Sequence, residues 1–447
     1  MKKIYEKSPV FIQNIILTLV NNYKYFQKFN AIPFFRPLSR VIQELEVDDF
    51  NDDKTLDRIN SLIENATRFV PYYQKNKSSY QKLKNIDELK NLPILQKSTL
   101  KKFNDEFVSS KSNRFNSYFF KTSGSTGTPI HGAISNVELK LRLRIFLKAL
   151  KLEGIDYSKP LARFPGADIA RNGSVYRKDY VNNHLILSIY HLSRERIKDY
   201  FNALEKNKIE IIEGYPSVIV TLVRLLKLHN LQLTRIKHIL TTAEKLLPHI
   251  KEEIETYFQT TIFDFYGSSE GSVFMYYSNK GYYLNSNVVG FFECVDENYN
   301  ELENSKNGRM LVTSFTSNFT PLIRYDIGDY ATIVSKENER ICVSEIQGRQ
   351  EEIYESPSGK SFGRFSLILK HLPDSILESQ LILTQKSNQV KLQYTSEENL
   401  PNVAFSTFEK KFSELLATEF SFTYERVLKF DKTNRGKLSA VKIIKND

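Results

Sequence analysis

Cysteine is scarce in this chain, and its scarcity excludes two ways of stabilising a fold. The 447 residues include only Cys294 and Cys342, and no CxxC pair occurs. Two cysteines this far apart are too few for a disulfide framework or for a four-thiolate zinc site. We therefore expect both to be small buried hydrophobic residues, in a protein of a reducing, cytoplasmic compartment.

A convincing targeting segment and a membrane span are also missing. Met1-Lys2-Lys3 is basic, and residues 10–20 are rich in aliphatic side chains that Gln13, Asn14 and Thr18 interrupt. This run is far shorter than the ~20 residues that a spanning helix needs, and no small-residue cleavage site follows it. Two interpretations stay open: a helix packed on its own protein, which we favour, or a helix lying on a membrane surface. The lysines that would then meet anionic headgroups are Lys2, Lys3, Lys24 and Lys28.

Blocks of like charge are absent as well. The net charge of +11 arises from 63 basic against 52 acidic residues, which are spread over the whole chain. A dispersed excess of this kind is usually a solvated surface, and it suits anionic small molecules such as nucleotides or coenzymes. Nucleic acid would require a basic stripe or a known binding motif, and neither occurs. We predict small-molecule partners and no nucleic acid.

The length and composition predict a globular protein with several domain-sized parts. A chain of 447 residues corresponds to about three such units. A content of 41% hydrophobic and 26% charged residues is ordinary for globular proteins. No internal repeat or low-complexity tract occurs.

The spacing of apolar residues predicts an α/β fold. Residues 1–110 show mostly helical spacing. Between 155 and 265, short apolar strands alternate with helices, which is typical of a parallel sheet whose ligands bind beyond the carboxyl ends of the strands. The expected helices are 41–47, 55–69, 86–92, 136–150, 216–229 and 246–258, and the expected strands are 209–212, 238–241 and 261–264.

The pattern changes again after residue 280 and after Gly348-Arg349. Residues 280–347 predict an antiparallel sheet or distorted barrel, and the last 100 residues predict a separate α+β unit. We therefore predict a large N-terminal domain at 1–347, with a helical portion at 1–95, and a small C-terminal lid domain at 348–447. The expected strands are 282–287, 290–295, 309–314, 330–334, 379–384, 389–394 and 423–430, and the expected helix is 404–420.

One loop consists wholly of hydroxyl-bearing residues and glycines. It reads Thr122-Ser123-Gly124-Ser125-Thr126-Gly127-Thr128 and is followed by Pro129. Glycines let a backbone approach a phosphate closely, and successive N–H and hydroxyl groups can then donate to its oxygens. No Lys-Ser or Lys-Thr pair closes the loop, so it is not a Walker sequence. Taken alone, the run also fits a flexible surface turn.

The segment Asp264-Phe265-Tyr266-Gly267-Ser268-Ser269-Glu270 ends an expected strand and enters a loop. An aromatic ring beside a glycine can stack on a base. The carboxylate of Glu270 could hold Mg²⁺, which needs few protein ligands when phosphates supply the rest. The alternative is a core tyrosine and a solvated glutamate.

The segment Tyr325-Asp326-Ile327-Gly328-Asp329 places two carboxylates around a glycine, shortly after Pro321. A carboxylate that accepts from two hydroxyls is a common way to hold a ribose. The alternative is a turn with capping aspartates.

Two shorter segments carry single basic side chains. Taken alone, Gly348-Arg349 fits an exposed charged turn, and Gly436-Lys437 fits a solvated lysine close to the chain end. A lysine on a glycine turn can, however, swing into a cleft.

Taken in order, these motifs resemble the adenylate-forming enzymes, which include acyl-CoA synthetases and nonribosomal adenylation domains. The resemblance is to the branch with phenylacetate–CoA ligase, coenzyme F390 synthetase and the capsular polysaccharide protein CapK, and it covers roughly residues 95–445. Thr242-Ala243-Glu244 and Gly214-Tyr215-Pro216-Ser217 also match this branch. Two departures are Ile130, where many relatives have a lysine nearby, and Glu352, where many have an aspartate.

The resemblance implies a role for each matched residue. Lys437 would stabilise the charge that develops on phosphate and carboxylate, Glu270 would hold Mg²⁺, and Asp329 would bind the ribose hydroxyls. The small domain would rotate about Gly348 and Arg349 between two half-reactions. The implied cofactor-binding residues are Ser123, Gly124, Ser125, Thr126, Gly127, Thr128, Ala243, Glu244, Asp264, Tyr266, Gly267, Ser268, Asp329 and Arg349.

The implied activity joins ATP, a carboxylic acid and an acceptor. The acceptor is coenzyme A if the chain is an acid–CoA ligase, or an amine or hydroxyl on a sugar or carrier if it acts as the CapK resemblance suggests. A nucleotide-binding scaffold without turnover is the third hypothesis. Residues Phe164, Tyr215, Pro216 and Gly290 are expected to line the acid pocket, with plain core packing as the alternative.

Overall fold

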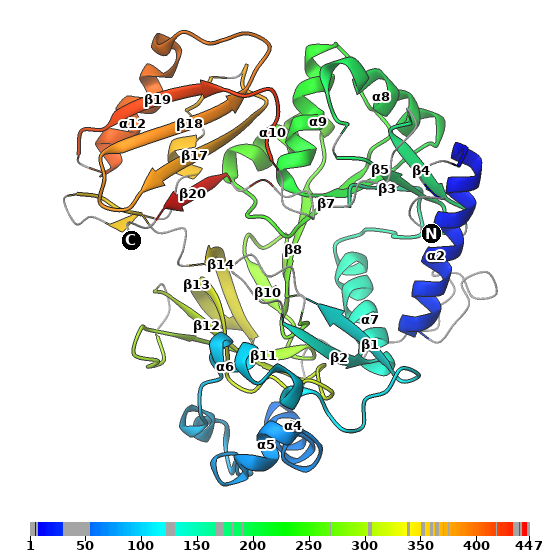
Figure 1. The fold of residues 1–447 in the computed structure, drawn as a ribbon, viewed down its shortest axis with the longest axis vertical. Coiled ribbons are helices and arrows are strands. Elements are labelled where there is room, and N and C mark those ends of the chain that lie inside the picture. The colour runs from blue at the N-terminus through cyan, green and yellow to red at the C-terminus, as the bar shows by residue number, and fades with distance from the viewer. Residues whose placement is uncertain are drawn as a thin grey trace. The chain divides into compact units, whose positions relative to one another are not determined.

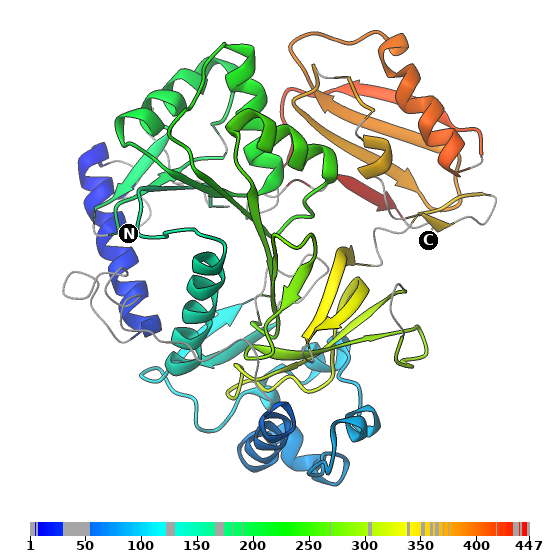
Figure 2. The same ribbon diagram turned by 180° about the vertical axis from the view of Figure 1, so that it is seen from behind.

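The chain folds into two compact units, which we describe separately (Figures 1 and 2). The first unit comprises Met1–Leu161, Arg177–Leu185 and Phe263–Gln347, and the second comprises Ala162–Tyr176, Ile186–Ile262 and Gly348–Asp447. The predicted division into 1–347 and 348–447 stays a prediction. The computed structural model describes residues 5, 8–29, 54–121, 130–165, 174–180, 182–189, 191–268, 270–302, 306–337, 340–349, 354–357, 361–362, 366–369, 371–373, 375–416, 418–431, 438 and 440–444.

An antiparallel sheet forms much of the first unit, as predicted for residues 280–347. Its strands lie in the order β11-β12-β13-β14-β10-β9-β8. Gly290 of β11 lies opposite Ser314 of β12, and the register with β13 shifts between Arg309 and Leu311. The strands are β8 (Ile262–Gly267), β9 (Phe274–Tyr277), β10 (Tyr283–Asn285), β11 (Gly290–Val295), β12 (Asn307–Ser314), β13 (Tyr325–Glu337) and β14 (Arg340–Arg349).

Short helices between residues 55 and 107 add to the same core. Helix α4 (Thr55–Phe69) buries Ile59, Leu62 and Ala66, whose spacing of three and four residues places them on one face. Tyr73 is fully buried and donates its hydroxyl to the Pro321 carbonyl at 2.9 Å. The helix predicted at 86–92 is a 3₁₀ helix, and the one predicted at 41–47 lies outside the described residues. The elements after α4 are α5 (Pro71–Lys75), η1 (Lys77–Ser79), η2 (Ile86–Asn91), α6 (Lys97–Lys102) and η3 (Asn104–Phe107).

Two longer helices lie side by side in the first unit. Helix α7 (Asn136–Leu152) begins with a capping box, in which Ser135 and Glu138 each bond to the other's backbone N–H. Helix α2 (Val10–Phe29) lies against α7 and against β1 (Figure 1). None of the helices in the described ranges combines the length and apolarity needed to span a bilayer. Nearby strands are β1 (Ser117–Lys121), β2 (His131–Ser135) and β4 (Tyr176–Asp179).

The predicted parallel sheet is found in the second unit. Its strands lie in the order β7-β6-β3-β5, and β6 pairs in parallel with β7 so that Gly214 lies opposite Thr241. Prolines occupy the first turn of α9 and α10, where a missing N–H has no helical partner to lose. The elements are β3 (Leu161–Arg163), β5 (His184–Leu187), η4 (Arg194–Arg196), α8 (Ile197–Lys206), β6 (Ile211–Gly214), α9 (Pro216–Leu228), β7 (His238–Thr242) and α10 (Pro248–Phe258).

The C-terminal part of the second unit is the predicted α+β structure, and its described residues include three short strands that the sequence did not predict. The hairpin of β17 (Glu378–Thr384) and β18 (Gln389–Thr395) is confirmed, and β20 (Val441–Ile444) pairs in parallel with β17. The observed helix α12 (Ser406–Leu416) is shorter than the helix predicted at 404–420, and the 3₁₀ helix η6 (Asn402–Phe405) precedes it. The other elements are β15 (Tyr354–Glu355), β16 (Ser361–Phe362), α11 (Ser366–Leu369) and β19 (Ser421–Arg426).

Candidate functional site

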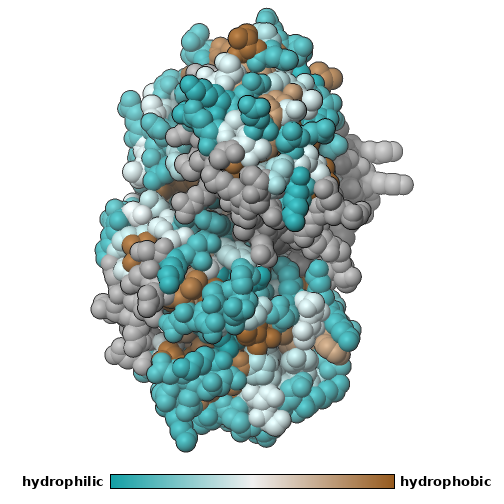
Figure 3. Space-filling view, turned by 90° about the vertical axis from the view of Figure 1, so that its left-hand side faces the viewer, coloured by the Kyte–Doolittle hydropathy of each residue, from teal (hydrophilic) through white to brown (hydrophobic). Residues whose placement is uncertain are grey.

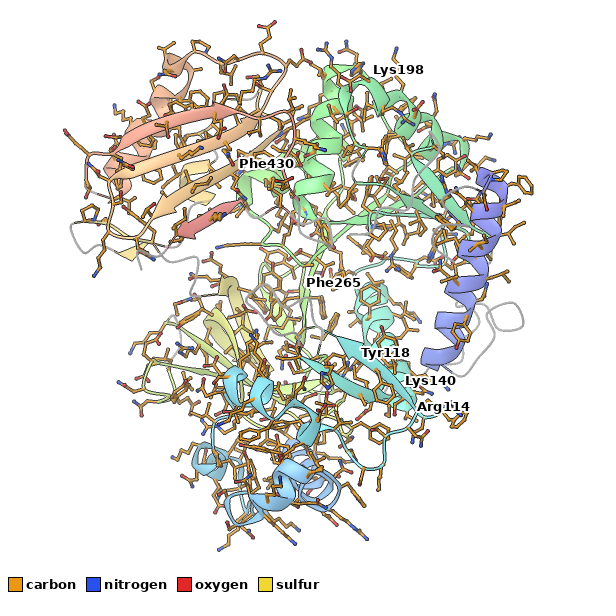
Figure 4. All side chains as sticks on the ribbon, in the orientation of Figure 1. Arg114, Tyr118, Lys140, Lys198, Phe265 and Phe430 are labelled. Carbon is orange, nitrogen blue, oxygen red and sulfur yellow. The ribbon has the colours of Figure 1, made fainter. Side chains whose placement is uncertain are left out.

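Two of the predicted motifs meet in the first unit. Tyr266 lies near the end of β8, and its hydroxyl donates a hydrogen bond to Asp329 Oδ2 at 2.5 Å, although 63 residues separate the two in sequence. The preceding residue, Phe265, packs on Phe146 of α7 with ring centroids 5.1 Å apart (Figure 4). Because side chains alternate along a strand, Tyr266 faces the other way. An aromatic ring and a carboxylate are thus held side by side.

The two aspartates of the Tyr325–Asp329 segment have different surroundings. Asp326 is buried, pairs with Arg309 at 2.9 Å and caps the turn by accepting from the Gly328 N–H at 3.0 Å. The capping interpretation therefore describes Asp326. Asp329, which contacts Tyr266, stays the predicted ribose ligand.

Asp264 binds another strand of the sheet. Its buried carboxylate accepts a hydrogen bond from the Tyr283 hydroxyl, which joins β8 to β10. Burial raises the pKa of Tyr283 well above its usual value, and the charge of Asp264 acts in the same direction. Asp264 therefore stabilises the strand that carries Tyr266, and its predicted contact with a nucleotide stays a prediction.

The backbone around Glu270 is held from several directions. Glu270 is 8% exposed, and its carbonyl accepts from Arg142 Nη2 at 3.3 Å and from Ser317 Oγ at 3.2 Å. The next carbonyl, of Gly271, accepts from Ser314 Oγ at 3.3 Å and Thr316 Oγ1 at 3.2 Å. This network fixes the backbone turn from which the Glu270 side chain extends.

Arg142 leaves no space for a side chain at Gly271. Its Nε donates to Thr316 Oγ1 at 2.9 Å. Burial lowers the pKa of Arg142 to about 10, although the Glu138 and Glu270 carboxylates act in the opposite direction. Gly271 has φ of +66°, and a Cβ there would lie 1.7 Å from Arg142 Nη1. Only glycine fits this turn, both for its left-handed backbone and for the guanidinium packed against it.

The Glu270 carboxylate could serve as the one protein ligand of a metal ion. Within the described residues no donor forms a hydrogen bond to it, and no group of three or more His, Cys, Asp or Glu residues is arranged as a metal site. Mg²⁺ is commonly bound by one or two carboxylates together with substrate phosphates and water. A carboxylate on a turn that is held in place suits such an ion.

In the second unit, two motifs follow adjacent parallel strands. Gly214 ends β6 and Thr242 ends β7. Beyond these ends, the Ser217 N–H donates to Glu244 Oε2 at 3.2 Å, so that a carboxylate meets the N-terminus of α9. Ala243 has φ of +70°, which is uncommon for a residue with a Cβ and recurs at functional sites. The structure thus brings Gly214–Ser217 and Thr242–Glu244 together.

The residues predicted to line the acid pocket differ in burial. Phe164 is buried and its ring stacks on Tyr200, with centroids 6.4 Å apart. Gly290 lies so near another segment that a Cβ would be 2.2 Å from the Ser272 carbonyl. Tyr215 is half-buried where Pro216 begins α9. Phe164 and Gly290 have the surroundings of core residues, and the contribution of all four to an acid pocket stays a prediction.

Several predicted residues lie wholly or partly outside the described residues. Arg349 is the last residue of β14, and its backbone alone is described. Ile130, which follows the predicted phosphate loop, is 1% exposed. Both cysteines are buried, as expected, and neither forms a disulfide; burial raises the pKa of Cys294 to about 11. The predicted residues without a described position are Ser123, Gly124, Ser125, Thr126, Gly127, Thr128, Glu352 and Lys437.

The sequence interpretation missed Arg142 and the hydroxyls of Ser314, Thr316 and Ser317. Both leave a visible signal. Arg142 interrupts a helical face that otherwise carries Leu139, Leu143 and Phe146, and residues 313–317 read Thr-Ser-Phe-Thr-Ser. A lone arginine on an apolar helix face and a run of hydroxyls after a buried strand both indicate a buried polar network.

Comparisons with known proteins show similarity both in sequence and in fold. No family model matches the chain. It is 22% identical over 446 residues to the protein CapK of Staphylococcus aureus, with 97% of each chain covered. It is 31% identical over 153 residues to the indoleacetate–lysine synthetase of Pseudomonas savastanoi, with 34% of this chain and 36% of the relative covered.

Solved structures extend the similarity to the fold. The structure of 2-hydroxyisobutyryl-CoA ligase in complex with its acyl-AMP matches with a TM-score of 0.68 at 16% identity, and covers 88% of this chain and 89% of its own. The anthranilate CoA ligase AuaEII in complex with anthranoyl-AMP matches with a TM-score of 0.51 at 14% identity, and covers 74% of this chain and 67% of its own. The chain has the fold of the adenylate-forming ligases, and its predicted resemblance to that superfamily is confirmed.

Proposed function

We propose that this protein is an AMP-producing ligase that activates a carboxylic acid with ATP and passes the acyl group to a thiol such as coenzyme A. The observation that carries the proposal is the hydrogen bond from Tyr266 to Asp329, formed by two distant motifs within this fold. The ring would stack on adenine while the carboxylate accepts from the ribose hydroxyls. Solved structures of the same fold include acid–CoA ligases with a bound acyl-AMP.

The first half-reaction joins the acid to AMP. A carboxylate oxygen of the acid attacks the α-phosphorus of ATP, the bond to the β-phosphate oxygen breaks, and pyrophosphate leaves. Two anions must approach each other, so positive charge and N–H donors are required around them. Ser123 to Thr128 would donate to the phosphates, and Lys437 would neutralise the charge that develops, as preorganised charge does for about 3–4 kcal/mol.

Glu270 is the residue that we propose as a Mg²⁺ ligand. A bound Mg²⁺ would neutralise phosphate charge. The chain's contribution is the position of the carboxylate, which Arg142 and Ser317 set by holding the Glu270 carbonyl.

The second half-reaction transfers the acyl group. The sulfur of the thiol attacks the acyl carbon, AMP leaves, and the thiol proton passes to solvent or to AMP. We propose that this chemistry takes place in the cytoplasm, because two buried cysteines that form no disulfide suit a reducing compartment.

A different acceptor is the second candidate. The similarity to CapK extends over 97% of both chains. The Pseudomonas savastanoi relative is named an indoleacetate–lysine synthetase, and this name indicates an acyl acceptor with an amine. Under this alternative the same adenylate would react with an amine or hydroxyl of a sugar or carrier in surface polysaccharide assembly. A nucleotide-binding scaffold without turnover is the third.

Hydroxamate trapping over a panel of acids, with ATP and Mg²⁺, tests the proposal. Acid-dependent release of pyrophosphate would support adenylation and exclude the scaffold. AMP release that requires coenzyme A would support the thiol acceptor, and AMP release that an amine or sugar stimulates without thiol would support the second candidate. Purified protein that converts no ATP to AMP with any acid would refute both.

A further inference from the structure

Helix α2 buries two polar side chains and exposes a row of apolar ones. A surface helix normally does the opposite. Gln13 is fully buried and Asn14 is 6% exposed, whereas four apolar side chains of the same helix are between 49% and 63% exposed. These four recur every fourth residue and therefore share one face. We call them the α2 apolar row: Phe11, Ile15, Leu19 and Tyr23.

Hydrogen bonds to β4 fix this orientation. Arg177 Nε donates to Gln13 Oε1 at 2.6 Å, and the Lys178 N–H donates to Asn14 Oδ1 at 3.2 Å. Two turns further along, Asn21 Nδ2 donates to Asp179 Oδ2 at 3.0 Å. A rotation of α2 that buried the apolar row would break these bonds and leave the buried polar groups without them, at a cost of about 1–3 kcal/mol each. The row therefore stays exposed.

Neighbouring elements extend the apolar surface. Helix α2 lies against β1 and α7, which carry the exposed residues Phe119 and Val137. Exposed Phe115 belongs to the loop that the Asn136 N–H holds through the Asn116 carbonyl at 2.9 Å. Scattered apolar residues are normal, as the face drawn in Figure 3 shows, but exposed apolar residues gathered on neighbouring elements that pack together are typical of an interaction site.

The charge of this surface has one sign. Residues 10–29 and 108–121 contain no acidic residue. The one acid of α7, Glu138, and the one acid of β4, Asp179, are 6% and 1% exposed. Arg114 and Lys140 are exposed, and Figure 4 shows them on the loop before β1 and on α7. The margin of the apolar surface is therefore cationic, without an exposed carboxylate among these described residues.

We propose that the surface formed by α2, β1 and the start of α7 binds an anionic lipid bilayer, with α2 lying in the plane of the interface. Apolar side chains that enter the acyl region, flanked by cations at headgroup level, are what an interfacial helix requires. A second copy of the chain would bring the same cationic margin against itself, which like-charge repulsion disfavours. This inference does not depend on the acceptor or the acid of the proposed reaction.

Sedimentation of the full chain with lipid vesicles tests this inference. We expect binding to an equal mixture of phosphatidylcholine and phosphatidylglycerol, and much weaker binding to phosphatidylcholine alone or at high salt. Leu19→Asp should lower the partition coefficient at least about tenfold. Leu428→Asp is the matched control, because Leu428 is exposed and lies in the other unit.

Charge reversal gives a second comparison. Lys140→Glu should weaken binding roughly tenfold, and Lys198→Glu, on the exposed surface of α8, should not (Figure 4). Far-ultraviolet circular dichroism would confirm that every variant is folded. Equal binding by the Leu19 and Leu428 variants, or no binding of the unchanged chain to the mixed vesicles, would overturn the proposal. A dimer that Leu19→Asp dissociates would instead assign the row to a subunit contact.

Discussion

An alanine at Gly271 should destabilise the turn that carries Glu270 by about 2.5–5 kcal/mol, as the sum of two effects. The first is conformational, because Gly271 has φ of +66°, and a residue with a Cβ loses about 1–2 kcal/mol in the left-handed region. The second is steric, because the new methyl carbon would lie 1.7 Å from Arg142 Nη1.

The steric effect has a definite magnitude. The guanidinium ends a long side chain and can move, but movement costs at least one of its bonds, to Thr316 Oγ1 at 2.9 Å or to the Glu270 carbonyl at 3.3 Å. A hydrogen bond that involves a charged group contributes about 1.5–3 kcal/mol, and the loss of one such bond is the steric effect in this sum. The displaced turn should also move the Glu270 carboxylate, so that adenylate formation falls and its requirement for Mg²⁺ rises.

Gly154 provides a matched control. It has φ of +74°, and nothing lies within 4 Å of a Cβ built there. Gly154→Ala should therefore show only the conformational cost of about 1–2 kcal/mol. Urea-induced unfolding followed by far-ultraviolet circular dichroism measures both variants, and the chain has no tryptophan to serve as a fluorescent probe.

A double-mutant cycle isolates the contact with Arg142. In a background of Arg142→Ala, the guanidinium is absent, and Gly271→Ala should then cost no more than Gly154→Ala. If the two glycine substitutions cost the same in the unchanged chain, or if removal of Arg142 leaves their difference intact, the steric argument is refuted.

Three further predictions concern the candidate site and the pH dependence of the protein's stability. Lys437→Ala should leave ATP binding nearly unchanged and lower adenylate formation at least about 10²-fold, measured by pyrophosphate exchange; an unchanged rate would remove Lys437 from the mechanism. Asp329→Ala should raise the KM for ATP about 10–100-fold, because lost bonds to a charged group cost about 1.5–3 kcal/mol, whereas Tyr266→Phe keeps the ring and should change KM less than about fivefold; equal effects would contradict ribose binding by Asp329. Burial, with Lys237 adding to it, lowers the pKa of His238, so the folded state holds fewer protons than the unfolded state. Stability should then be complete above about pH 6.5 and fall as the pH decreases through that value. Thermal unfolding of His238→Gln should show a smaller acid-induced loss, and an identical pH profile would exclude this contribution.

Local patterns predicted most of the regular structure. The alternation of strands and helices between residues 155 and 265 predicted the parallel strands β6 and β7, because a buried parallel strand is apolar throughout and its crossover helix is amphipathic. The hairpin of β17 and β18 followed from two short apolar runs separated by a polar turn. The strand β20 was not predicted, since its partner strand β17 lies more than fifty residues earlier in the sequence.

By itself, the sequence determined which chemical groups this protein offers and in which order they occur. Glycine-rich loops, a tyrosine beside a glycine and paired carboxylates are local features, and short-range sterics and hydrogen bonding suffice to interpret them. Only the tertiary structure decided which of these groups meet. Asp326 and Asp329 look alike in sequence, yet one caps a turn beside Arg309 and the other contacts Tyr266. The exposed face of α2 was decided in the same way, because the partners of Gln13 and Asn14 lie more than 160 residues further along the chain. A buried polar group takes the partner that the fold brings to it, and no local pattern encodes that partner.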